Sequence, residues 1–82
     1  MRSTGLDIGG GVMVPLQSVI CVLAWQEALK SRTNRDLVLS LQAKGKVITI
    51  GGGDHRSLVI CDDVVYLSFL SPGTISMRAR RI

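Results

Sequence analysis

The sequence predicts one small α+β domain in which a mostly antiparallel sheet is accompanied by helices. Two observations support this prediction: short apolar runs are separated by glycine-rich turns, and only two segments carry the signals that begin a helix. The chain has 82 residues, of which 46% are hydrophobic and 20% charged, so it is long enough for one domain and is not disordered by composition. We expect a single domain over residues 1–82, with residues 1–5 and 81–82 flexible.

The N-terminal part of the chain predicts a β-hairpin followed by a buried strand. Leu6 to Ile8 and Val12 to Val14 read as extended runs on either side of Gly9 to Gly11, a turn in which positive φ angles are inexpensive. Pro15 ends the second run. Val19 to Trp25 is apolar on both faces, which predicts a central strand that is covered on both sides.

One central helix is predicted from about Asn34 to Lys44. Thr33 is a suitable N-cap with an acidic residue, Asp36, three positions later, and Gly45 stands where a helix often ends. The apolar stripe of this helix contains Leu37, Val38 and Leu41. The preceding segment, residues 26–32, is polar and mixed, and it predicts no regular element.

The C-terminal half predicts a three-stranded meander and a short terminal helix. The strands are Lys46 to Ile50, Ser57 to Cys61 and Val64 to Leu70. The second glycine-rich turn, Gly51 to His55, and a tight Asp62-Asp63 turn join them. Ser71 and Pro72 suit the N-cap and first position of a helix that runs to about Arg80.

The sequence shows no pattern of catalytic or metal-binding chemistry. Cys21 and Cys61 each lie inside an apolar run, and the chain has one His and no CxxC pair, so two free thiols are expected and no metal site. Both glycine-rich turns precede strands, whereas a phosphate loop needs a helix to follow. His55 and Asp54 lie on a turn without a recognisable nucleophile. We therefore expect no enzyme, no cofactor and no small-molecule substrate.

The hydrophobicity of so short a chain predicts a homo-oligomer. The mean hydropathy is +0.35, whereas a domain of this size buries only about 60% of its unfolded surface. No apolar run approaches the roughly 20 residues that a membrane-spanning helix needs, and the start of the chain does not resemble a signal peptide. We expect a cytoplasmic protein without a membrane partner. The candidate interface residues are Leu39, Phe69, Leu70, Ile75 and Met77.

The charge of the chain suggests a polyanionic partner. Ten Lys and Arg residues against six Asp and Glu residues give a formal net charge of +4. Arg56 follows the second glycine-rich turn, Arg35 lies at the predicted helix start, and Arg78, Arg80 and Arg81 cluster near the C-terminus. So few basic residues would bind DNA weakly in a monomer, but a closed ring repeats each of them, and phosphate contacts add in proportion to their number.

Several segments share their order and spacing with one known family. They are Leu6 to Gly10, the apolar strand after Pro15, Arg56 to Ile60, Val65 to Ser68, and Ser71, Thr74 and Arg78. From about Leu6 to Ala79 the chain resembles the small bacterial extracellular-matrix regulators RemA and RemB, and it resembles RemB more closely. The resemblance implies a subunit like half of a LytTR-type DNA-binding domain. It also implies a ring around which DNA wraps, acting as a transcriptional regulator of biofilm matrix genes.

The sequence departs from the family where DNA contact is implied. In RemA the basic DNA-contacting residues lie in the turn before the strand that here begins at Arg56. That turn is Gly51 to His55 in this chain, and it carries Asp54 where arginines are expected. Either DNA contact depends on Arg56 with Arg35 and the C-terminal arginines, or the protein is an oligomeric interaction scaffold of the same family that does not bind DNA.

Overall fold

The computed structural model describes residues 4–51 and 53–81, and it confirms the α+β class. Strands β3, β5, β6 and β4 form a four-stranded sheet in that order, and β1 and β2 form a separate hairpin. The elements in chain order are β1 (Gly5–Asp7), β2 (Met13–Pro15), the 3-10 helix η1 (Leu16–Ser18), β3 (Val19–Ala24), α1 (Trp25–Lys30), α2 (Arg32–Ala43), β4 (Val47–Thr49), β5 (Ser57–Cys61), β6 (Val65–Ser68) and α3 (Pro72–Arg80). None of the described helices is long and apolar enough to cross a membrane.

The predicted chain ends are only partly described. Residues 1–3 and 82 lie outside the described residues, so the expectation that they are flexible has no counterpart here. Gly5 was expected to be flexible but begins β1, where it pairs with Pro15. Arg81 directly follows α3, and its backbone N–H donates to the carbonyl of Arg78.

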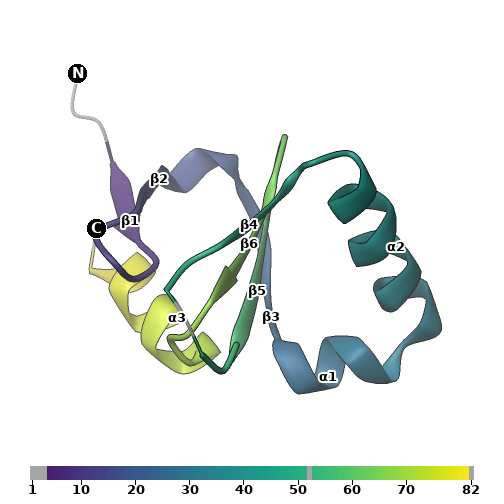
Figure 1. The fold of residues 1–82 in the computed structure, drawn as a ribbon. Helices are drawn as coiled ribbons and strands as arrows, with labels where there is room; N and C mark the ends of the chain where they lie inside the picture. The colour runs from purple at the N-terminus through teal and green to yellow at the C-terminus, as the bar shows by residue number, and fades with distance from the viewer. Residues whose placement is uncertain (1–3, 52, 82) are drawn as a thin grey trace.

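The four-stranded sheet lies between two layers (Figure 1). Helices α1 and α2 cover one face, whereas α3 and the β1–β2 hairpin cover the other. Each layer closes its own apolar core. The core beneath α3 and the hairpin contains Leu6, Ile8, Val14, Ile50, Val59, Cys61 and Ile75. The core beneath α1 and α2 contains Ala28, Val38, Leu58, Val65 and Leu67.

The strand buried on both faces is β5, and the prediction that the Val19 to Trp25 run forms the central strand is wrong. Strand β3 lies at one edge of the sheet, beside β5. Its residues are apolar on both faces because both layers extend over this edge. A β-bulge at Ile20 also changes the alternation, so that Val19 and Val22, three residues apart, both pack against the α3-side core. The bulge leaves Ile20 65% exposed.

The helical segment differs from its prediction at the start. Helix α2 begins at Arg32, and its cap is Ser31, whose hydroxyl accepts a hydrogen bond from the backbone N–H of Asn34 at 3.3 Å. Thr33, the predicted cap, lies inside the helix. The segment before Ser31 predicted no element but forms α1, whose Ala28 is buried. Gly45 ends the helical region with φ of +71°, as predicted.

The predicted meander is wrong in its topology, although all three strands are present. β4 does not pair with β5; it pairs with β6 in parallel, with Val47, Ile48 and Thr49 opposite Val65, Tyr66 and Leu67. The segment after β4 therefore passes β6 before it enters β5. A meander assumes that consecutive strands are neighbours, whereas here β6 lies between β4 and β5.

Helix α3 is capped as predicted and is fixed to the hairpin. The Ser71 hydroxyl accepts from the Thr74 backbone N–H at 3.2 Å, and Pro72 occupies the first turn. Ile75 is completely buried against the core. The buried Ser68 hydroxyl donates to the Ile8 carbonyl at 2.6 Å and accepts from the Leu70 N–H at 3.1 Å, which links the end of β6 to the hairpin.

Candidate nucleic-acid interface

Arg56 combines a fixed backbone with an exposed side chain. Its N–H donates to the Ser68 carbonyl at 2.8 Å, and its carbonyl accepts from the Trp25 N–H at 3.0 Å. Because both neighbouring elements hold this residue, little conformational entropy of the backbone remains to be lost when the side chain binds a ligand. The guanidinium is thus presented from a rigid position at the entrance to β5.

Arg35 lies on the other side of the same surface region. It lines a groove of about 340 Å³ between the helical layer and the start of β5. We call this the α2 groove; its other walls are Trp25, Leu29, Val38, Leu39, Gln42, His55 and Leu67. An adjoining hollow, which includes Arg56, shares Trp25, Leu29 and His55 with the groove. The structure therefore brings Arg35 and Arg56 to opposite sides of the Trp25–His55 pair.

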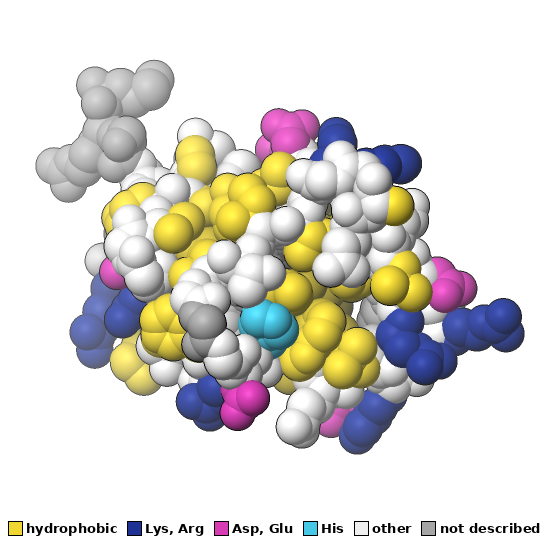
Figure 2. Space-filling view, viewed as in Figure 1, with side chains coloured by type: hydrophobic (Ala, Val, Ile, Leu, Met, Phe, Trp, Pro, Cys, Tyr) yellow, Lys and Arg dark blue, Asp and Glu magenta, His cyan; other side chains and the backbone are white. Residues whose placement is uncertain are grey.

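The Trp25–His55 pair forms the ridge between the two basic side chains. The rings meet edge to face, with centroids 5.8 Å apart and an interplanar angle of 89°. Figure 2 shows His55, the one cyan side chain, next to hydrophobic side chains that continue toward α2. Trp25 begins α1 directly after β3, so the position of this ring is set by the strand-to-helix junction.

The C-terminal arginines do not join Arg35 and Arg56. Arg78 is already engaged, because its Nη1 lies 3.3 Å from Oδ2 of Asp7 and donates to the Asp7 carbonyl at 3.2 Å. This contact fixes α3 to the hairpin. Arg80 and Arg81 are exposed at the end of α3, in the layer across the sheet from α1 and α2 (Figure 1). The predicted DNA-binding residues thus divide into one paired group, one structural residue and one remote pair.

The turn before Arg56 carries a negative charge close to the candidate contact. Asp54 is exposed and lines the same hollow as Arg56. Within residues 4–51 and 53–81 the two side chains form no ion pair. Asp54 will therefore reduce the positive potential at the hollow without occupying the guanidinium.

The predicted interface residues differ widely in exposure. Leu39 is 61% exposed, Met77 55% and Phe69 38%, whereas Leu70 is partly buried. Ile75 is removed from the candidate interface, because it is completely buried within the chain itself and cannot meet a partner. Its position in α3 gave no indication of this, because α3 is short and its apolar positions are few.

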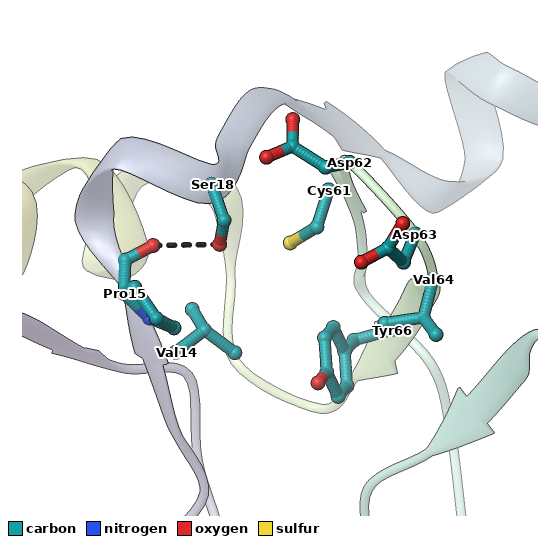
Figure 3. Close-up of a pocket in the computed structure, with 8 residues that line it drawn as sticks. All are labelled: Val14, Pro15, Ser18, Cys61, Asp62, Asp63, Val64 and Tyr66. Atoms are coloured by element: carbon teal, nitrogen blue, oxygen red, sulfur yellow. Dashed lines mark hydrogen bonds between the residues drawn. The ribbon is translucent and has the colours of Figure 1, made fainter.

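A second hollow lies at the opposite end of β5 (Figure 3). Ser18, Cys61, Asp62, Asp63 and Tyr66 are among the residues that line its volume of about 230 Å³. Cys21 and Cys61 are both free thiols, as predicted. Burial raises the pKa of the Cys61 thiol above its ordinary value, so this group stays protonated at neutral pH. In the described part of the chain, no group of three His, Cys, Asp or Glu side chains is arranged as metal ligands.

Sequence reasoning located the two arginines but missed the groove between them. Trp25, Leu29 and His55 come from a helix that had no predicted counterpart and from a turn. A signal was nevertheless present in α2. Arg35, Val38, Leu39 and Gln42 have the i, i+3, i+4, i+7 spacing of one helix face, and all of them line the groove.

Comparison with known proteins agrees with the resemblance seen in the sequence. A search of curated proteins found no match. The model of the RemA-like family, described as extracellular matrix regulatory protein A-like, matches residues 6–79. This match is to the family as a whole, so the closer similarity to RemB stays a prediction. Because the match covers most of the chain, the protein belongs to the RemA-like family of extracellular matrix regulatory proteins.

Proposed function

We propose that this protein is a cytoplasmic, DNA-binding transcriptional regulator of extracellular matrix genes that acts as a ring-shaped homo-oligomer. In this proposal Arg56, assisted by Arg35, contacts the phosphate backbone of duplex DNA. The observation that carries it is the exposed Arg56 side chain on a backbone held from both sides, with Arg35 across the Trp25–His55 ridge.

The surroundings of Arg56 favour an anionic ligand. Arg56 lines a further hollow together with Pro72, the first residue of α3. The N-terminal end of a helix carries a partial positive charge, so this end of α3 adds to the attraction of the guanidinium for phosphate. Arginine also binds phosphate through two parallel hydrogen bonds, which lysine cannot do.

Exposed apolar side chains support the oligomeric part of the proposal. Eight large hydrophobic residues are at least 38% exposed: Met13, Ile20, Leu29, Leu37, Leu39, Ile48, Phe69 and Met77. Single exposed residues are common on monomers, but Leu29 and Leu39 line the same groove. Strands β3 and β4 also form the two edges of the four-stranded sheet.

Replacement of Arg56 by alanine tests the proposed contact. In a gel-retardation assay on duplex DNA, Arg56→Ala is expected to weaken binding at about 0.1 M salt by roughly tenfold or more, because each subunit loses one phosphate contact. The loss is expected to be similar for unrelated DNA sequences, since phosphate contacts carry no base information.

Arg80→Ala is the matched control for Arg56→Ala, because it removes an equally exposed arginine from the other layer. It is expected to bind DNA nearly as well as the wild type. Absence of retardation for the wild-type protein at low salt would contradict the proposal, and a larger loss for Arg80→Ala would move the contact to the end of α3.

A second candidate function is an oligomeric interaction scaffold of the same family without DNA contact. It is favoured by Asp54, which places a carboxylate in the hollow of Arg56. In that case the wild-type protein still forms an oligomer, and Arg56→Ala has no effect on any nucleic-acid binding because there is none to lose.

A further inference from the structure

We infer that neighbouring subunits join head to tail, with the surface around Ile20 of one copy seated in the α2 groove of the next. This inference rests on the proposed oligomer and specifies its contact. The first surface, which we call the Ile20 knob, consists of Ile20, Asp62 and Asp63.

The α2 groove is apolar at its floor and basic at its rim. Trp25, Leu29, Leu39 and Leu67 provide apolar walls, and Leu39 remains 61% exposed. Arg35 and His55 add nitrogen donors at the same groove. The groove therefore suits an apolar side chain that is accompanied by carboxylates.

The Ile20 knob has the complementary composition. The β-bulge pushes Ile20 out of the ladder, where it is the most exposed large hydrophobic residue among those described. Its neighbour Val19 pairs with Cys61, which directly precedes the exposed Asp62 and Asp63. A hydrogen bond from the Asp62 N–H to the Ser18 carbonyl at 3.0 Å holds this turn against the start of β3. Figure 3 shows both carboxylates at this turn.

The positions of the two surfaces require a head-to-tail contact. The groove includes His55, just before β5, whereas the knob includes Asp62, just after it. At about 3.3 Å per residue, the five residues of β5 separate the two surfaces by roughly 17 Å. A knob at one end cannot fill the groove of its own chain, but a second copy carries the matching partner. Repetition of such a contact produces a ring if the rotation closes.

The occupant is a second copy because one chain carries both halves of a complementary pair. The knob has two carboxylates and the groove has Arg35 beside His55, so the contact joins opposite charges around a buried apolar centre. The same charge pattern opposes knob-to-knob contact, because it would bring four carboxylates together. It thereby selects the head-to-tail arrangement over a symmetric dimer.

The test is the mass in solution of two single variants, measured by light scattering. Ile20→Asp disables the knob and Leu39→Asp disables the groove, and both are expected to reduce the oligomer to monomers. Both side chains are more than 60% exposed, so folding should be unaffected, as circular dichroism can verify. The matched controls are Met13→Asp and Leu37→Asp, which place the same charge at exposed positions outside both surfaces; they are expected to remain oligomeric.

Mixing the two disabled variants distinguishes head-to-tail from symmetric association. Each keeps the surface that the other lacks, so an equimolar mixture at high concentration is expected to give a one-to-one dimer that grows no further. A mixture that stays monomeric would overturn the inference. So would oligomers of Ile20→Asp or Leu39→Asp that resemble the wild type, or dissociation caused equally by the controls. A monomeric wild-type protein would instead contradict the ring in the proposed function.

Discussion

Replacing Ile75 with alanine is expected to lower the free energy of unfolding by roughly 2–5 kcal/mol, the range for large-to-small substitutions in a well-packed core. Ile75 is completely buried and connects α3 to the core that also contains Ile8 and Val59. The loss combines the transfer free energy of the removed methyl and methylene groups with the cavity that remains. Urea unfolding followed by circular dichroism, at one fixed protein concentration, measures it.

Met77→Ala is the control for Ile75→Ala on the same helix. Met77 is 55% exposed, so its truncation is expected to change stability by less than about 0.5 kcal/mol. Equal effects of the two substitutions would contradict the placement of Ile75 in the core. A loss of oligomer without a loss of monomer stability in Ile75→Ala would return this residue to the subunit interface.

Ser68→Ala is expected to destabilise the fold by about 1–3 kcal/mol despite its small change in size. The Ser68 hydroxyl is buried and serves two groups at once, donating to the Ile8 carbonyl and accepting from the Leu70 N–H. Without it, both backbone groups lose a partner away from water. The same unfolding measurement applies, and the loss is expected to weaken the attachment of the β1–β2 hairpin to the sheet.

Ser76→Ala provides the comparison for Ser68→Ala, because Ser76 is exposed on α3. Alanine also has a higher helix propensity than serine, so this substitution is expected to be neutral or slightly stabilising. If Ser68→Ala proved as mild as Ser76→Ala, the hydrogen bonds of the Ser68 hydroxyl would not contribute to stability as described.

Local signals in the sequence predicted the elements whose structure is locally determined. The first glycine-rich turn closes a hairpin because Gly9 to Gly11 all adopt positive φ, and Ser71 with Pro72 begins α3 where expected. Helix α1 was missed because its six residues bury only Ala28, which leaves no apolar period to detect. The start of α2 was displaced because Ser31 and Thr33 are both acceptable caps by residue type.

Strand order could not be predicted from local patterns. An apolar run is compatible with a central strand and with an edge strand that is covered on both faces, so β3 and β5 were confused. The parallel pairing of β4 with β6 depends on contacts between residues far apart in the chain, such as the Ile50 N–H with the Leu67 carbonyl. No periodicity reports such a contact.

The candidate site was predictable only in its charged residues. Arg35 and Arg56 stand out in a sequence because of their charge and their positions next to predicted elements. Their approach to a shared ridge depends on α1 and the 51–56 segment, which bring Trp25 and His55 together. Arg78 shows the reverse case: its charge suggested DNA contact, but Asp7 in β1 pairs with it inside the chain.

The salt dependence of DNA affinity tests the central claim, which is that a ring repeats a weak basic site into an effective one. In a plot of log affinity against log salt concentration, each phosphate contact contributes a slope of about −0.9. Arg35 and Arg56 of one chain can therefore give a slope of about −2 at most. The ring account predicts a slope several times steeper, because several subunits engage one duplex. A slope of about −2 or shallower, or no binding at low salt, would contradict it.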